Sequence, residues 1–133
     1  MNEFQFELTP EALDTSAPEW DGRFGADLTF AGVVRDTEDG SPIRGIEYSA
    51  YPPMVREKMA YLGRAAGERF GAHRAKIVHR TGFVEAAEPS LLLQVAAAHS
   101  AEAFEICQWY LEHLKREIPI WKNIVTTRSE DLS

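Results

Sequence analysis

The stretch that organises this chain is Leu114–Lys122, with the sequence Leu-Lys-Arg-Glu-Ile-Pro-Ile-Trp-Lys. Apolar residues at helical spacing lead into it, and an apolar run typical of a strand follows Pro119. Proline lacks the N–H that a helix interior requires, and it drives the residue before it out of the helical conformation. We therefore expect a helix that ends before Pro119, with Lys115 near its end and Lys122 just past the turn.

This bend would let the amines of Lys115 and Lys122 converge on one pocket. Two ammonium groups held close together lower each other's pKa, and a lysine with a lowered pKa can act as a nucleophile or a base. The alternative is that both are ordinary solvated lysines. Their spacing alone does not decide between the two interpretations.

Composition restricts the class of protein. A chain of 133 residues with 44% hydrophobic and 26% charged residues predicts one globular domain over residues 1–133. The net charge of −7 argues against a nucleic-acid partner, and no apolar run approaches the roughly 18 residues of a membrane span. The start of the chain has no secretory signal. A single cysteine, Cys107, and scattered histidines predict no disulfide and no metal site, which favours a cytoplasmic location.

Strand patterns recur along the chain. The expected strands are Glu3–Leu8, Gly25–Arg35, Ile43–Tyr51, Lys76–Gly82, Ser90–Ala98 and Ile120–Thr127. Ser90–Ala98 is the most apolar and should be central and covered on both faces. Gly25–Arg35 is expected to form a hairpin with Ile43–Tyr51 around a mobile acidic loop, Asp36–Pro42. Gly32 within it indicates a bulge or a close approach by another backbone.

Two long helices and one short helix are also expected. The first long helix covers about Met54–Phe70, and the second begins at His99-Ser100, with Ser100 as its cap. Thr9-Pro10-Glu11 has the features of a short helix start. The buried stripe of the last helix should be Phe104, Cys107, Leu111, Leu114 and Ile118. Strands combined with two long helices indicate an α+β fold with an antiparallel or mixed sheet.

Two further side chains that can carry positive charge stand at the ends of elements. Arg35 lies where a strand meets a loop, a usual place for functional residues, although pairing with the neighbouring acids explains it equally well. His99 precedes a helix N-terminus, where free N–H groups attract anions; the alternative is a structural histidine. Together with Lys115 and Lys122, they would form a cationic pocket for a small anionic substrate, with an amine available for chemistry.

Five motifs extend this interpretation. They are Phe30-Ala-Gly-Val-Val-Arg35, Tyr51-Pro-Pro-Met54, Val78-His-Arg-Thr-Gly82, Ala98-His99 with Ala103-Phe104, and Leu114-Lys115 with Pro119-Ile-Trp-Lys122. In this order and at these spacings, the chain from about Gly25 to Lys122 resembles the large, catalytic subunit of molybdopterin synthase. The resemblance implies an α+β fold with an α/β-hammerhead-type core. It also implies a homodimer with a small ubiquitin-like subunit at each end, which together form a heterotetramer.

The resemblance further implies a sulfurtransferase of molybdenum cofactor biosynthesis. The C-terminal thiocarboxylate of the small subunit would enter a pocket of this chain. It would transfer sulfur to cyclic pyranopterin monophosphate to form the dithiolene of molybdopterin, so no bound cofactor is expected. By matching position, Lys115 and Lys122 would be the catalytic lysines, and Arg35 and His99 would hold the phosphate of the substrate.

The chain departs from the family at two expected substrate contacts. Ser100 stands where the family usually has arginine, and Asn123 stands where a basic residue is common. These departures leave one alternative open, a divergent, non-catalytic paralogue that only docks a ubiquitin-like partner. The pair His79-Arg80 matches a family motif, and we expect a structural role for it.

Overall fold

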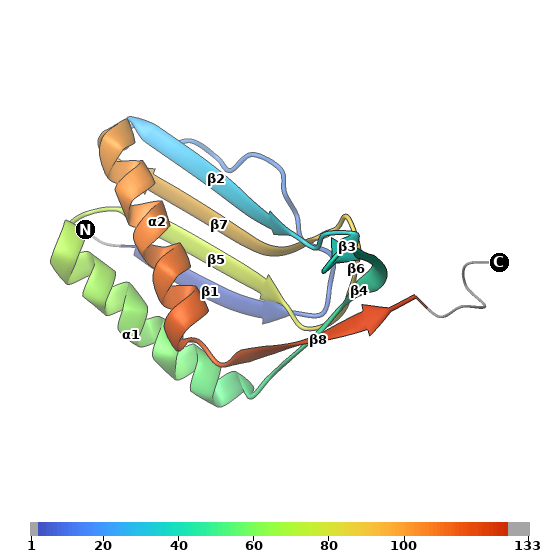
Figure 1. The fold of residues 1–133 in the computed structure, drawn as a ribbon. Helices are drawn as coiled ribbons and strands as arrows, with labels where there is room; N and C mark the ends of the chain where they lie inside the picture. Colours follow the sequence, from blue (N-terminus) through green and yellow to red (C-terminus); the bar gives the residue numbers. More distant parts are fainter. Residues whose placement is uncertain (1–2, 128–133) are drawn as a thin grey trace.

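The computed structural model describes residues 3–127 as two sheets and two helices (Figure 1). The first sheet has the order β1-β5-β7-β2. Its strands are β1 (Glu3–Thr9), β2 (Ala26–Val33), β5 (Arg74–Arg80) and β7 (Pro89–Ala97). β1 runs parallel to β5, and the other two pairs are antiparallel. The predicted α+β fold with a mixed sheet is therefore confirmed, as is the central place of β7.

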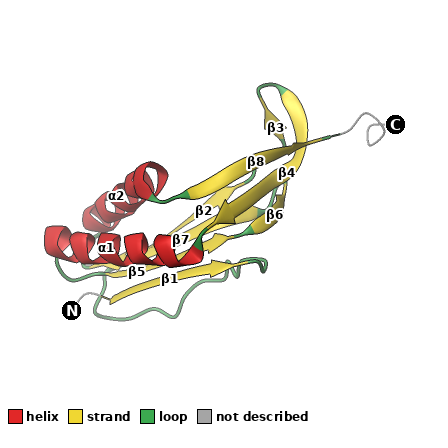
Figure 2. Cartoon of the chain, turned by 90° about the horizontal axis from the view of Figure 1, so that it is seen from below, coloured by secondary structure: helices red, strands yellow, loops and turns green. Residues whose placement is uncertain are grey.

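A second sheet projects beyond the helices at one end of the molecule (Figure 2). It consists of β3 (Thr37–Glu38), β4 (Ser41–Ala50), β6 (Gly82–Glu85) and β8 (Ile120–Thr126). β4 pairs with all three of the others. The predicted hairpin between the second and third expected strands is wrong, because β2 pairs with β7 instead. Two of the neighbours of β4, β6 and β8, come from distant parts of the chain, and local patterns do not reveal them.

The segment predicted to be a mobile loop forms the tight β3–β4 hairpin. Thr37 and Glu38 pair with Pro42 and Ser41, and the turn between them is Asp39-Gly40. Both turn residues have positive φ, 50° at Asp39 and 79° at Gly40. A two-residue hairpin turn with positive φ at both positions matches the right-handed twist of its strands, and Asp-Gly is a preferred sequence for it. The bulge predicted at Gly32 is confirmed as a register shift at Gly32/Val33.

Two helices, α1 (Pro52–Phe70) and α2 (Ser100–Glu117), cover one face of the first sheet (Figures 1 and 2). α1 begins two residues earlier than predicted, because prolines suit the first turn of a helix. The core between the helices and the sheet includes Met59, Leu62, Ile77, Leu93, Val95, Ile106 and Tyr110. Neither helix in residues 3–127 is long and apolar enough to cross a membrane.

The predicted stripe of the last helix is confirmed at Cys107, Leu111, Leu114 and Ile118, which lie in the core or pack against it. It is wrong at Phe104, whose side chain is 63% exposed. The buried residues of α2 also include Ala103, Ile106 and Tyr110. Cys107 packs in the core as predicted, and burial raises the pKa of its thiol. Ser100 is not the cap, because the capping position falls on His99, whose side chain makes no capping hydrogen bond.

The short helix predicted at Thr9-Pro10-Glu11 is absent from the described residues. The Glu11 N–H donates to Thr9 Oγ1 over 3.1 Å, a local turn that competes with helix formation. The connection to β2 instead runs along the sheet face that the helices leave uncovered (Figure 2). The end of this connection is anchored by Arg23, which donates to Asp21 and Glu3. The hydrogen bonds from Arg23 to Asp21 lower the pKa of Asp21 to about 2.

The close approach of β4 and β6 gives a stability test. A Cβ added at Gly45 would lie 2.2 Å from the backbone oxygen of Val84 and 2.7 Å from the ring of Phe83. We expect Gly45→Ala to lower the free energy of unfolding by about 2 kcal/mol, because backbone must move to relieve the overlap. Urea denaturation measures this change. Gly22→Ala is the control, since its Cβ meets nothing within 4 Å; an equal effect of both substitutions would contradict the packing described here.

Candidate functional site

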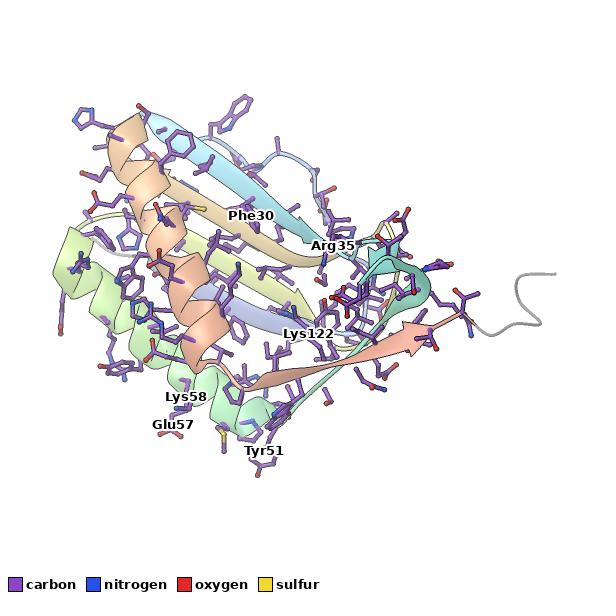
Figure 3. All side chains as sticks on the ribbon, viewed as in Figure 1. Phe30, Arg35, Tyr51, Glu57, Lys58 and Lys122 are labelled. Atoms are coloured by element: carbon purple, nitrogen blue, oxygen red, sulfur yellow. The ribbon has the colours of Figure 1, made fainter. Side chains whose placement is uncertain are left out.

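A cavity of about 670 Å³ lies where the two sheets and the end of α2 meet. Lys115 comes from the last turn of α2, Lys122 from β8, and Arg35 from the connection between β2 and β3. Figure 3 shows Arg35 and Lys122 at this end of the molecule, whereas Lys58 lies on α1. The predicted convergence of Lys115 and Lys122 on one pocket is confirmed.

Pro119 explains the placement of both lysines. α2 ends at Glu117, and Ile118 is extended, with φ −92° and ψ 121°, as expected for a residue before proline. Ile118 is buried, which anchors the turn. β8 then begins at Ile120, and the alternation of side chains along a strand places Lys122 and Ile124 on the cavity face.

Arg35 fits both of the interpretations that its sequence allowed. Its Nη2 lies 3.3 Å from Glu38 Oε2, so it does pair with a neighbouring acid. Both residues also line the cavity. The Arg35 side chain is 75% exposed, and such exposed ion pairs contribute little stability. The guanidinium therefore remains available to an anionic ligand in the cavity.

Three polar residues of the cavity wall were not predicted as site residues: Tyr48, His79 and Ser90. The buried Tyr48 hydroxyl and Ser90 Oγ form a hydrogen bond of 3.1 Å. The ring of Tyr48 meets His79 edge to face, with 5.0 Å between ring centroids. The sequence predicts a structural role for His79, but its side chain lines the cavity. It lies on the same face of β5 as Ile77, at the end of the strand nearest the cavity.

The charged side chains that line the cavity are mostly positive. They are the cations Lys115, Lys122 and Arg35 and, among residues 3–127, one acid, Glu38. Burial, together with the positive charge of Lys122, holds the pKa of His79 below its usual value, while its bond to the Arg80 carbonyl acts the other way. The walls also contain apolar side chains from β2, α2 and β8, including Phe30, Leu114 and Ile124. A small anionic molecule with some apolar surface suits such a cavity.

Three other predicted site residues lie outside this cavity. His99 and Ser100 are exposed at the opposite end of α2, and 16 helical residues place them about 24 Å from Lys115. Asn123 is exposed on β8 beside Glu47, on the strand face that alternates with that of Lys122. Of the six predicted site residues of one chain, Arg35, Lys115 and Lys122 therefore line the cavity. The other three, His99, Ser100 and Asn123, lie outside it.

Fold and site together define a class of protein. It is an α+β protein with a cationic cavity, in which two lysine amines can polarise or attack a carbonyl group beside an anion.

Comparison with known proteins identifies the family. Residues 5–117 match the family described as MoaE protein, and the chain belongs to this family. A molybdopterin synthase catalytic subunit from Pyrococcus abyssi is 37% identical over 106 residues, which cover 80% of this chain and 72% of the relative. The crystal structure of molybdopterin synthase from Staphylococcus aureus superposes with a TM-score of 0.85 at 28% identity, covering 94% of this chain and 93% of that one.

A further solved structure shares the fold at lower identity. It is a complex of subunits 1 and 2 of the molybdopterin-converting factor from Helicobacter pylori, with a TM-score of 0.72 and 22% identity. The match covers 93% of this chain and 90% of that chain. These comparisons confirm the family inferred from the five motifs.

The wall of the cavity gives a second stability test. Tyr48→Phe removes the hydroxyl that bonds to Ser90 but keeps the ring beside His79. We expect a loss of about 1 kcal/mol in the free energy of unfolding, because a buried Ser90 hydroxyl loses its partner. The matched control is Tyr61→Phe, since Tyr61 is 60% exposed and its hydroxyl contributes little. Equal unfolding midpoints for the wild type and Tyr48→Phe would show that this hydrogen bond is not stabilising.

Proposed function

We propose that this chain is the catalytic subunit of a molybdopterin synthase that transfers sulfur to cyclic pyranopterin monophosphate. The observation that carries the proposal is the convergence of Lys115, Lys122 and Arg35 on one cavity in a member of the MoaE family. The alternative of a non-catalytic docking paralogue is not favoured, because both lysines are present and both line the cavity.

The two lysines suit the chemistry of a thiocarboxylate. In this proposal, the thiocarboxylate sulfur attacks a substrate carbon and displaces the oxygen bonded to that carbon, which leaves with a proton. Water then cleaves the bond between the acyl carbon and sulfur. The sulfur stays on the substrate, and the donor leaves as a carboxylate. Negative charge develops on the acyl oxygen during cleavage, and an ammonium group aimed at that oxygen stabilises it. We assign this role to Lys115 and Lys122, and two such transfers complete the dithiolene.

Arg35 is proposed to hold the phosphate of the substrate. A guanidinium can donate two parallel hydrogen bonds to phosphate oxygens, which fixes orientation as well as position. Its present partner, Glu38, is held by a weak exposed ion pair that the anionic phosphate can replace. Asn123 directly follows Lys122 along β8. We propose that the backbone of Asn123 contacts the substrate at the rim of the cavity.

His99 and Ser100 can reach the substrate only from a second copy of the chain. The surface beside α2 and β2 is suited to such a copy. Phe104 is 63% exposed, Val33 54% and Phe30 37%, and β2 is an edge strand of its sheet. If two α2 helices pack antiparallel across a twofold axis, His99 and Ser100 of one copy lie near Lys115 of the other. We therefore propose a homodimer with two shared sites.

The sulfur donor is proposed to be a separate small subunit with a ubiquitin-like fold and a C-terminal thiocarboxylate. The complex of two subunits known for the Helicobacter pylori converting factor supports such a partner. One small subunit at each site of a homodimer gives a heterotetramer, and no bound cofactor is required. A cytoplasmic location belongs to this proposal, since the buried Cys107 is a free thiol.

Reconstitution tests the assignment of the lysines. The chain is mixed with a thiocarboxylated small subunit and cyclic pyranopterin monophosphate, and molybdopterin is measured as its fluorescent oxidised derivative. We expect Lys115→Ala to lower turnover by at least about a hundredfold, because an oxyanion loses its stabilising cation. Circular dichroism should be unchanged, since Lys115 is exposed.

Lys58→Ala is the matched control, because Lys58 is an exposed lysine on α1 outside the cavity (Figure 3). Near-normal turnover in Lys115→Ala would contradict the assignment. A stable complex with the small subunit but no product from the wild-type chain would instead support the docking paralogue.

Complementation between variants tests the shared site. Lys115→Ala and His99→Ala should each be inactive alone. Mixed by co-expression, half of the dimers carry one variant of each kind, and each such dimer has one intact site. We therefore expect activity to return to roughly a quarter of the wild-type value. If activity does not return although mixed dimers are isolated by two affinity tags, His99 does not act across the dimer.

A further inference from the structure

We propose that His79 is a positioning residue for Lys122: its neutral ring offers an Nε2 lone pair to the Lys122 amine inside the cavity. This proposal rests on the function proposed above and adds a residue to it. It also gives a role to the His79-Arg80 pair, which the sequence had suggested to be structural.

The first step is the tautomer of His79. Nδ1 lies 2.7 Å from the backbone oxygen of Arg80. A carbonyl oxygen only accepts hydrogen bonds, so Nδ1 carries the proton and donates it. In a neutral ring, Nε2 is then unprotonated and is a hydrogen-bond acceptor. The edge-to-face contact with Tyr48, at 5.0 Å between centroids, holds the ring in this orientation.

The second step is the direction of Nε2. His79 lines the cavity together with Lys115 and Lys122. Nε2 has no hydrogen-bond partner in residues 3–127, and it is not among the fully buried atoms that lack one. The buried side-chain nitrogens and oxygens without a partner in that range are Nε of Arg74 and Nε of Arg80. An acceptor is therefore open to a cavity whose walls supply mainly cationic donors.

The third step is the protonation state. The groups facing His79 are Lys122 from β8, Lys115 from α2, Tyr48 from β4, and Arg35 with Glu38 from the β2–β3 segment. Within its own sheet, its neighbours are the apolar Leu8 and Leu91. Burial and the charge of Lys122 both favour the neutral ring, against the opposing effect of the Arg80 carbonyl. At neutral pH the ring is thus ready to accept a hydrogen bond from Lys122.

The consequence is a dependence of activity on pH. Protonation of His79 at acidic pH removes the acceptor and places an imidazolium beside the Lys122 ammonium. The two cations repel each other, so Lys122 leaves its productive position. We expect kcat to fall as pH decreases through the lowered pKa of His79. KM should change less, because Arg35 and not His79 is assigned to the phosphate.

Two substitutions separate positioning from structure. His79→Asn keeps an N–H near the Nδ1 position, so the bond to the Arg80 carbonyl is retained, but the Nε2 acceptor is lost. His79→Gln can place an amide oxygen near Nε2. We expect kcat to fall roughly tenfold or more in His79→Asn, with partial recovery in His79→Gln and no acid limb from residue 79 in either variant. His113→Gln, on α2 outside the cavity, should match the wild type.

The closing experiment needs no turnover. The imidazole of His79 is titrated by NMR in the homodimer, with His113 as an internal reference. We expect the pKa of His79 to be below that of a solvated histidine, and to rise in Lys122→Met, where the neighbouring charge is lost. Lys115→Met should raise it less.

The outcomes distinguish this proposal from the function it rests on. A His79 pKa that does not respond to Lys122→Met would overturn the proposal, whatever the enzyme does. An unchanged acid limb in His79→Asn would overturn it as well. If the titration behaves as expected but reconstitution yields no molybdopterin, the contact between His79 and Lys122 stands and the proposed function fails.

Discussion

The conformational restriction that Pro119 imposes is the constraint on which the site depends. It ends α2 at Glu117 and holds Ile118 extended, so the chain leaves the helix and enters β8 after a single turn. β8 then pairs with β4 over Ile43–Ala50 and joins the second sheet to the helical layer. A longer α2 would carry Lys122 away from the cavity. The same restriction thus determines both the topology and the position of the lysines.

The cavity lies between two separate hydrophobic cores. One core packs beneath the helices, and the other consists of Val34, Ile43, Ile46, Tyr48 and Val84. Ile120 packs against both, so the start of β8 bridges them. Where two cores meet, side chains fill space incompletely, and polar groups such as the hydroxyls of Tyr48 and Ser90 can be satisfied by one another. This junction can therefore hold lysines and a polar substrate without opening either core.

The length of α2 holds two groups of predicted site residues apart within one chain. Its C-terminal end presents Lys115 to the cavity, while its N-terminal end presents His99 and Ser100 about 24 Å away, at 1.5 Å per residue. In the homodimer proposed above, a twofold axis would bring the N-terminal end of one α2 and the C-terminal end of the other to one substrate. The exposed Phe104 between the two ends would then be covered by the second copy. In this arrangement, dimerisation completes the site and also removes exposed apolar surface.

The sequence by itself determined what depends on neighbouring residues. Pro119 predicted the end of α2 and the pair Lys115 and Lys122, alternation and apolar runs predicted β1, β2, β4, β5, β7 and β8, and the five motifs predicted the family. Tertiary structure alone decided what depends on distant residues. It paired β4 with β6 and β8 and brought His79 and Tyr48 into the cavity wall. The physical reason is that periodicity specifies which face of an element is apolar, whereas only long-range packing selects the partner that covers it.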